Sequence, residues 1–241
     1  MNVEIWSDVI CPWCYIGKRQ FEEVLKHFPH GDQVAVIWRS YQIDPEAPKH
    51  PNTSMDKVQM TKQFGDPALV KVMIDRISTL AAEAGLEYNL EKIVYSNSFD
   101  AQRLIHFAAT KQVQDAVLER LLKAYFTDGA AIGDQEVLVQ IASELGLDAD
   151  ETRSLLAGEA YTHEVNADIK RARMLGIQGL PFFLIDEKYS LTGIQPANVL
   201  TDALEKAWLD AHPLIDISGN REETGACEID NGCFPTPNQN T

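Results

Sequence analysis

The chain has 241 residues, of which 45% are hydrophobic and 24% charged, a composition typical of a folded globular protein. No apolar run approaches the roughly 18 residues of a membrane-spanning helix, and a net charge of −15 disfavours binding to nucleic acid. The four cysteines are too few for a disulfide scaffold. They form two pairs near the two ends of the chain, Cys11 with Cys14 and Cys227 with Cys233.

The first segment of the chain predicts a βαβ unit. Residues Met1–Trp6 lack the basic and apolar regions of a secretory leader, so we expect a cytoplasmic location. Val3–Trp6 is a short apolar run that suits a buried strand, and Cys11-Pro12-Trp13-Cys14 then opens a helix that runs to about Phe28. Its proline falls in the first turn, where the missing N–H costs nothing. Val34–Trp38 is apolar and β-branched, so we expect a second, parallel strand covered on both faces.

Residues 51–175 predict an all-helical insertion, because their apolar residues recur mainly at helical spacing. Asp66-Pro67 matches an N-cap followed by proline at the first helical position. Four helices are expected from sets of apolar positions: Leu69, Val72, Met73, Ile77, Leu80 and Ala84; Val117, Leu118, Leu121, Leu122 and Tyr125; Val137, Leu138, Ile141 and Leu145; and Val165, Ile169 and Ala172.

Strand character returns at Phe182–Ile185, and Tyr189–Thr192 can pair with it in the antiparallel sense after a turn. A helix from about Pro196 to Asp210 follows. The order of elements therefore predicts an α/β protein with a thioredoxin fold, formed by residues 1–50 and 176–210 around the insertion at 51–175. Residues 211–241 form an acidic tail rich in Gly, Pro and Asn, which carries the second cysteine pair.

The spacing of Cys11 and Cys14 indicates redox chemistry, because two thiols at a helix N-terminus can form a disulfide within one turn. We expect an exposed Cys11 and a Cys14 inside the turn. The helix N-terminus favours a thiolate at Cys11, and since Pro12-Trp13 adds no positive charge, a moderately lowered pKa is expected. Cys11 would attack a disulfide and Cys14 would resolve the mixed disulfide. Two buried structural thiols, or half of a metal site, are the alternatives.

Gly179-Leu180-Pro181 directly precedes the third predicted strand. In a thioredoxin fold this loop carries a cis-proline that faces the dithiol, so we expect Pro181 to be cis. Its ring would turn the Leu180 backbone toward Cys11, where it could pair with an extended substrate. Pro12 and Trp13 are expected to contact the substrate as well. An ordinary trans-proline at the start of an edge strand is the alternative.

Five segments resemble DsbA-like oxidoreductases of the FrnE group: Ser7 to Gly17, Ser98-Phe99-Asp100-Ala101, Ala124-Tyr125-Phe126, Ile132-Gly133-Asp134, and Gly176 to Phe183. The resemblance spans roughly residues 1–210 and implies a thioredoxin fold with a helical insertion. It implies thiol–disulfide exchange with protein or small-molecule partners, with Cys11 as nucleophile, Cys14 as resolving thiol and Pro181 as cis-proline. The chain lacks the leader and the dipeptide histidine of the periplasmic members, which allows a reductase or isomerase role.

Cys227 and Cys233 flank Asn231-Gly232, a strong signal for a tight turn that could bring the two sulfurs together. A relay of disulfide exchange with Cys11 and Cys14, a static disulfide and two unrelated thiols stay open as interpretations. A four-cysteine zinc site is disfavoured, because this spacing is long for a zinc knuckle and Pro181 would crowd the first pair. No metal or cofactor is expected.

Two other functions are compatible with the same architecture. One is a glutathione-dependent transferase or a 2-hydroxychromene-2-carboxylate isomerase, whose members usually have serine where Cys11 stands. The other is a binding or adaptor protein with silent cysteines. Asp8 lies three residues before Cys11 and either accepts a proton from Cys14 or caps the following helix.

Overall fold

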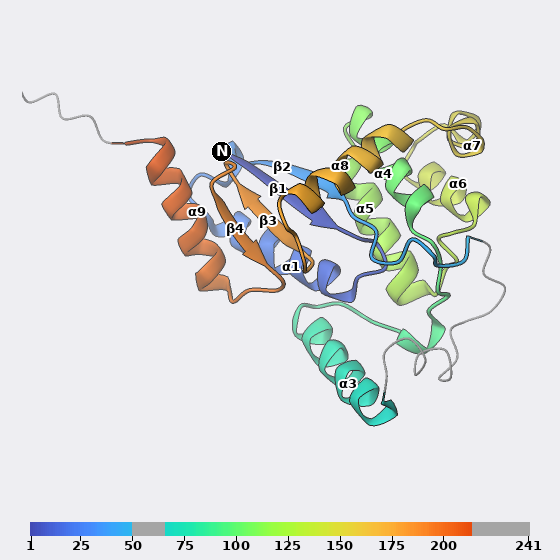
Figure 1. Cartoon of the computed structure of the whole chain (residues 1–241), viewed down its shortest axis with the longest axis horizontal. Coiled ribbons are helices and arrows are strands. Elements are labelled where there is room, and N and C mark those ends of the chain that lie inside the picture. The colour runs from blue at the N-terminus through green and yellow to red at the C-terminus, as the bar shows by residue number, and fades with distance from the viewer. Residues whose placement is uncertain (50–65, 214–241) are drawn as a thin grey trace, which may run out of the picture.

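The computed structural model describes residues 1–49 and 66–213 (Figure 1). Cys227, Cys233 and the predicted tail from residue 214 onward lie outside the described residues. The elements are β1 (Asn2–Ser7), α1 (Pro12–His27), η1 (Gly31–Gln33), β2 (Ala35–Ser40), α3 (Pro67–Glu83), η2 (Leu90–Lys92), α4 (Phe99–Thr110), α5 (Gln114–Lys123), the π-helical turn η3 (Ala124–Asp128), α6 (Gln135–Glu144), α7 (Ala149–Ala157), α8 (Thr162–Met174), β3 (Phe182–Ile185), β4 (Tyr189–Thr192) and α9 (Ala197–Ala211).

The four strands form one mixed sheet in the order β2-β1-β3-β4. β1 and β2 pair in parallel, with Ile5 opposite Trp38, as the predicted βαβ unit requires. β3 runs antiparallel to both β1 and β4, and the turn between β3 and β4 includes Asp186 and Glu187. This is a thioredoxin fold with a helical insertion, so the predicted fold class is confirmed.

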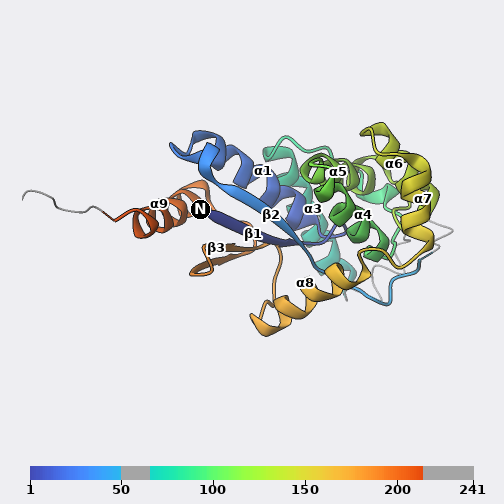
Figure 2. The same ribbon diagram turned by 90° about the horizontal axis from the view of Figure 1, so that it is seen from above.

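Helices cover both faces of the sheet, because successive side chains of β1 point in opposite directions. Val3 and Ile5 are buried in the main core, to which α1 and α9 also contribute side chains. Trp6 packs on the other face with Ala172 of α8, and its indole N–H donates to the Asp168 backbone oxygen at 3.1 Å. Figure 2 shows α1 and α8 on opposite sides of the strands. The start of α1 is thereby held at one end of the sheet.

Between β2 and β3, all the elements of the described residues are helical (Figure 1). The four predicted helices correspond to α3, α5 with η3, α6 and α8, and the N-cap is confirmed because Asp66 accepts from the Ala68 N–H at 2.7 Å. The sequence did not locate α4 and α7. Seven of the residues of α4 are buried, and they include the polar Gln102 and Arg103, so polar residues do not mark an exposed side of this helix. α7 has nine residues, too few turns for a clear period.

The predicted apolar face of α3 is wrong in part. Leu69 and Val72 are 69% and 66% exposed, whereas Val70 and Ile77 are buried. Apolar residues occur on several sides of this helix, so periodicity alone does not select the buried side. The side that faces the body of the molecule is set by packing against α1, which is distant in sequence.

Candidate active site at the start of helix α1

Cys11 and Cys14 lie at the amino-terminal end of α1. Cys11 is the N-cap residue with an extended backbone, and Pro12 occupies the first helical position, as predicted. The Cys14 N–H donates to the Cys11 carbonyl at 3.0 Å. Both thiols are free and buried. Two thiols at this spacing at a helix N-terminus can form a reversible disulfide within one turn.

The prediction that Cys11 is exposed is wrong, because Cys11 is 3% exposed and Cys14 is 1% exposed. A helix end faces solvent unless another part of the chain packs over it. Here the insertion does so, since Ile77 of α3 and Phe126 of η3 line the same cavity as Cys11. Access of a substrate to the Cys11 sulfur is thus limited by the insertion.

The predicted lowering of the Cys11 pKa is also wrong. The hydrogen bond with the Cys14 side chain, followed by burial, raises the pKa of the Cys11 thiol well above its ordinary range. The Cys14 backbone N–H acts in the opposite direction, and the negative charge of Asp8 raises the pKa further. With the insertion packed over it, Cys11 therefore carries its proton at neutral pH.

Pro181 borders the helix that carries the redox pair. The Leu180–Pro181 peptide bond is cis, as predicted. The proline ring packs so closely on α1 that a Cβ added to Gly17 would lie 2.6 Å from Pro181 Cγ, so glycine is needed one turn after Cys14. The Pro181 carbonyl accepts from the Gly193 N–H at 2.7 Å, which ties the loop to the residue after β4.

An apolar pocket of about 260 Å³ opens beside Cys11. Its lining consists of Ile10, Cys11, Pro12 and Trp13 from the redox turn, Ile43 from the segment after β2, Val70, Met73, Ile74 and Ile77 from α3, Leu90, Ile93 and Tyr95 from η2 and the segment after it, and Tyr125 and Phe126 from η3. Of the predicted substrate contacts, Pro12 and Trp13 lie in this lining, whereas Leu180 does not. The insertion thus supplies most of the pocket.

Tyr88, which the sequence did not single out, connects the insertion to the redox turn. Its hydroxyl donates to the Pro12 carbonyl at 2.8 Å, and its ring stacks on Phe126 with 4.7 Å between the ring centroids. Burial, and then the charge of Cys11, raise the pKa of Tyr88 far above its ordinary value, so the hydroxyl stays a donor. Tyr88 and Pro12 are 76 residues apart, and no local pattern marks such a contact.

Asp8 is fully buried behind the redox turn. Its Oδ2 accepts from the Ile43 N–H at 2.7 Å and its Oδ1 from the Ile10 N–H at 3.4 Å, and both isoleucines line the apolar pocket. Burial raises the pKa of Asp8 to about 6, although these hydrogen bonds act in the opposite direction. The capping interpretation is wrong, since α1 has no side-chain cap. Proton transfer between Asp8 and Cys14 stays a prediction.

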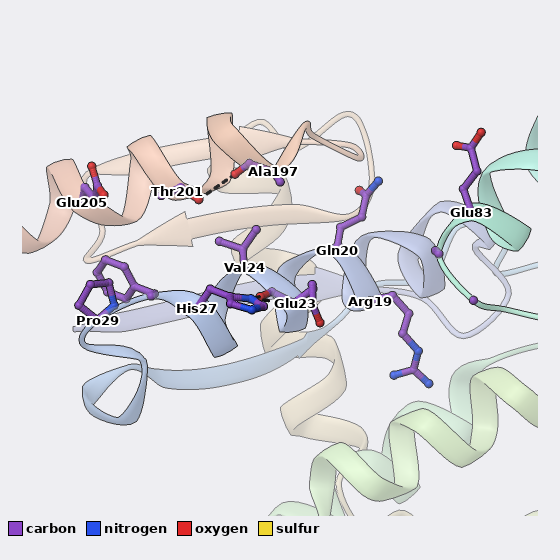
Figure 3. A pocket seen from close by; sticks show the side chains of 13 residues that line it. Arg19, Gln20, Glu23, Val24, His27, Pro29, Glu83, Ala197, Thr201 and Glu205 are labelled. Carbon is purple, nitrogen blue, oxygen red and sulfur yellow. Dashed lines mark hydrogen bonds and ion pairs between the residues drawn. The ribbon is translucent and has the colours of Figure 1, made fainter.

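A larger cavity, of about 830 Å³, lies between α1, α9 and the end of α3 and excludes both cysteines (Figure 3). The labelled side chains do not converge on one point. Arg19 points toward the helix α5, where it pairs with Glu119, and Glu83 points away from the other lining residues. Without convergent polar groups or a reactive side chain, this cavity is not assigned a function.

A second polar cluster, outside the redox site, contains Ser40, His106 and Asp168. Ser40 Oγ and Asp168 Oδ2 both lie 3.1 Å from the same ring atom, His106 Nε2, so the three side chains do not form a nucleophilic triad. Across residues 1–49 and 66–213, no three His, Cys, Asp or Glu side chains are grouped to hold a metal ion. None of the helices in this part of the chain could cross a membrane.

Comparison with known proteins finds a family and several solved structures that this chain resembles. Residues 2–205 match the family described as DSBA-like thioredoxin domain. A solved structure, a probable DsbA oxidoreductase from Streptomyces coelicolor, is 38% identical with a TM-score of 0.81, and the match covers 98% of this chain and all of that one. The uncharacterized protein YwbO of Bacillus subtilis is 27% identical over 212 residues, which is 87% of this chain and 96% of YwbO.

The same fold also occurs in a different kind of enzyme. A solved 2-hydroxychromene-2-carboxylate isomerase is 13% identical with a TM-score of 0.65, and the match covers 90% of this chain and all of that one. This likeness concerns the fold alone. The choice between disulfide exchange and isomerisation therefore depends on the residues at the site.

Proposed function

Because the chain belongs to the DSBA-like thioredoxin domain family, we propose that it is a thiol–disulfide oxidoreductase that reacts through Cys11 and Cys14. The observation that carries the proposal is the pair of free thiols at the start of α1, with Cys11 at the N-cap and Cys14 in the first turn. Two such thiols supply both electrons that reduction of one disulfide requires. The sequence from Ser7 to Gly17 supports assignment to the FrnE-like group.

The proposed reaction consists of two displacements at sulfur. Cys11 first loses its proton, and its thiolate attacks one sulfur of a substrate disulfide. The other substrate sulfur leaves and takes up a proton. The Cys14 thiolate then attacks the Cys11 sulfur of the mixed disulfide, and the second substrate thiol leaves. The substrate gains two electrons and two protons, and the protein is left with a Cys11–Cys14 disulfide. An external thiol returns the protein to its dithiol form.

We propose reduction of substrates as the net direction. A stable thiolate makes a protein disulfide strongly oxidising, whereas the hydrogen bond with Cys14 and burial raise the pKa of Cys11. Equilibration with a glutathione buffer should give a potential nearer to about −270 mV, as in thioredoxin, than to about −120 mV, as in DsbA. A measured reduction potential of the Cys11–Cys14 disulfide above about −180 mV would instead indicate net oxidation of substrates. A reducing cytoplasm suits a protein that has to regain its dithiol.

Trapping of the mixed disulfide tests the proposed function. A Cys14→Ser variant cannot resolve the intermediate, so it should accumulate substrate linked through Cys11, seen by mass spectrometry under non-reducing conditions. A Cys11→Ser variant, which retains the other thiol, should accumulate none. Glutathione conjugation or isomerisation without any mixed disulfide would select the transferase or isomerase alternative. Normal biological function of the Cys11→Ser variant would select the adaptor alternative.

The same proposal assigns roles to the neighbouring residues. Trp13 and Pro12 line the pocket beside Cys11 and would contact the substrate there. Pro181, packed against Gly17 of α1, would limit which ligands approach the thiols from the opposite side. The Leu180 backbone, next to it in the loop, would pair with an extended substrate.

A further inference from the structure

We propose that the apolar pocket beside Cys11 binds the ring of a small organic disulfide, one or two fused rings in size, and so selects the substrate of the exchange reaction. This inference rests on the proposed function, since a substrate is selected here only if Cys11 reacts with disulfides. It adds the substrate class, because the redox pair alone would react with disulfides of many kinds.

The position of the pocket links it to the reaction. Cys11 is itself part of the lining and is 3% exposed, so a sulfur that approaches it must carry its substituent past the insertion. Met73 and Ile74 of α3 and Phe126 of η3 belong to the same lining. An apolar group attached to the reacting sulfur would leave water for this lining, which is favourable. A polar group in the same place would lose its hydration without compensation.

The volume of the pocket sets the size of the ring. An apolar protein cavity of roughly 150 Å³ accommodates one benzene molecule, and drug-sized ligands occupy pockets of roughly 300 Å³ or more. About 260 Å³ lies between these values. The pocket therefore has room for one substituted ring or two fused rings, and three fused rings exceed it.

One lining residue offers a polar contact for the ligand. Tyr125 is 3% exposed, and its hydroxyl has no hydrogen-bond partner among residues 1–49 and 66–213. Burial raises the pKa of this phenol well above its usual range, so it is neutral. A hydroxyl that borders the pocket without a protein partner can form a hydrogen bond with a ligand oxygen or nitrogen. The preferred ligand is thus an apolar ring that carries one polar atom.

The lining favours a small molecule over an unfolded polypeptide. A peptide strand brings an N–H and a C=O at every residue, and each has to be hydrogen-bonded when it is buried. Three of the polar side chains in the lining are Cys11, Trp13 and Tyr95, and the Tyr95 hydroxyl already donates to Asp44. The pocket thus offers a ring a largely apolar surface, and it offers the N–H and C=O groups of a peptide backbone few hydrogen-bond partners.

A matched series of disulfides tests the proposal. Reduced full-length protein is mixed with bis(2-hydroxyethyl) disulfide and with 2-hydroxyethyl disulfides whose second group is benzyl, 2-naphthylmethyl or 9-anthrylmethyl. The rate constant of each single turnover is measured by quenching and mass spectrometry. The benzyl and naphthylmethyl compounds should react at least tenfold faster than the bis(2-hydroxyethyl) compound, and the anthrylmethyl compound more slowly than the naphthylmethyl one. Equal rates for the last two would contradict an enclosed pocket.

Two neighbouring residues of α3 provide the variant and its control. Met73→Trp places an indole in the pocket and should reduce the ratio of the benzyl to the bis(2-hydroxyethyl) rate constant at least fivefold. Val72→Trp adds the same side chain at a position that is 66% exposed and outside the lining, and should leave the ratio unchanged. An equal loss in both variants, or in neither, would overturn the proposal.

The outcomes separate this inference from the proposed function. No reaction with any disulfide, including the bis(2-hydroxyethyl) compound, would refute the oxidoreductase itself. Reaction with all of them within a factor of three would refute the pocket and leave the oxidoreductase intact. A disulfide-linked peptide with phenylalanine beside cysteine serves as the competing substrate. If it reacts tenfold faster than the benzyl compound and Met73→Trp slows it equally, the occupant is a polypeptide and the proposal is wrong.

The polar contact has its own test. Among the 2-, 3- and 4-hydroxybenzyl compounds, the best isomer should react at least threefold faster than the benzyl compound with the wild-type protein. Tyr125→Phe keeps the aromatic ring of the side chain and removes its hydroxyl, so the hydroxybenzyl compound should lose its advantage over the benzyl compound. If no hydroxybenzyl isomer exceeds the benzyl compound, the ligand has no polar atom at this position and that part of the proposal fails.

Discussion

Two buried ionisable side chains, Cys11 and Asp8, determine how the site depends on pH. Each lies within or beside the β1–α1 junction, and each has a raised pKa, so the folded protein retains protons that an exposed thiol or carboxyl group would lose. The sequence predicted a lowered pKa for Cys11, because this residue stands at a helix N-terminus, which stabilises a thiolate. Burial and the hydrogen bond with Cys14 outweigh that effect.

Alkylation of Cys11 tests this assignment directly. The rate of its reaction with iodoacetamide should still increase above pH ~9, whereas an ordinary exposed thiol with a pKa of about 8.5 approaches its plateau there. The Cys14→Ser variant lacks the Cys14 thiol, whose hydrogen bond is the largest cause of the raised Cys11 pKa. The midpoint of the alkylation rate against pH should therefore move to lower pH. The modified residue is identified by peptide mass spectrometry. A plateau already reached at neutral pH in the wild-type protein would show that Cys11 is a thiolate there.

Asp8 is expected to make the folded protein less stable as the pH rises. Its pKa is raised from 3.8 to about 6, so between these values the folded protein holds a proton that the unfolded chain has lost. The free energy of unfolding should therefore fall through this window, by about 3 kcal/mol in all for a shift of roughly two pKa units. Asp8→Asn, which cannot ionise, should gain stability relative to wild type as the pH rises from about 4 to about 7.

Urea denaturation at several pH values measures this difference. The asparagine introduced at this position can still accept a backbone N–H, so the comparison between pH values is more informative than the absolute free energy. If the two proteins keep a constant difference in the free energy of unfolding across the whole window, Asp8 has an ordinary pKa. The proposed cost of its burial would then be wrong.

At the scale of elements, the contact between α1 and the loop before β3 is the tightest feature of the site. A methyl group on Gly17 would meet the ring of Pro181 at 2.6 Å, a distance that real Cβ atoms essentially never show. The ring is rigid and the loop is tied to Gly193, so neither side can yield easily. Overpacking of this kind usually costs about 1–3 kcal/mol.

Gly17→Ala should therefore lower the free energy of unfolding by about 1–3 kcal/mol and lower the rate of disulfide exchange, because Pro181 is pushed away from the thiols. Gly158→Ala serves as the control. Gly158 has negative φ, and an added Cβ would meet its first neighbour, a backbone oxygen, at 3.3 Å. Chemical denaturation and an exchange assay measure both effects. Wild-type exchange in the Gly17→Ala variant would show that the position of Pro181 is unimportant for the reaction.

Elements were predictable where the local pattern decides their structure. The strands of the sheet, the start of α1 and the cap of α3 follow from apolar runs, proline and Asp66. The buried side of α3 and the existence of α4 were not predictable, because α3 is apolar on several sides and α4 is buried almost all round. Which residues lie inside is decided there by packing partners far along the chain.

At the scale of the whole molecule, a cluster of charged side chains around the buried Lys18 joins α1 to α5. The Lys18 side chain on α1 is 1% exposed and pairs with Glu22 on its own helix and with Asp115 and Glu119 of α5. Its ammonium group lies 3.2 Å from Asp115 and 3.3 Å from Glu119. Arg19 also pairs with Glu22 and Glu119, so removal of Lys18 takes one of two cations from this cluster and leaves Asp115 without its partner on α1.

Lys18→Met keeps the length of the side chain and removes its charge, so it should lower the free energy of unfolding by about 2 kcal/mol, as expected for hydrogen bonds to charged groups. Lys71→Met is the matched control. It breaks an exposed pair with Asp75 within α3 and should change the free energy by about 0.5 kcal/mol or less. Urea denaturation compares the two. An equal effect would mean that Lys18 does not couple the two parts.

The residues of the candidate site were predictable from the sequence, whereas their burial and their contacts with the insertion were not. Cys11, Cys14 and the cis-proline were found from spacing and from the order of elements. Their burial, the pocket and the contact of Tyr88 with Pro12 depend on residues far along the chain, for which one sequence holds no signal. The assignment of 1–50 and 176–210 to one domain and of 51–175 to the insertion stays a proposal.

The long interval between the two halves of the site has a consequence for biosynthesis. Cys11 and Cys14 leave the ribosome well before Pro181, and at about 5–20 residues per second the delay is on the order of 10–30 s. During that time the insertion is still being synthesised and the proline loop cannot yet pack beside the nascent thiols. Cells that make this protein therefore have to keep a reactive dithiol from oxidation while translation is still under way.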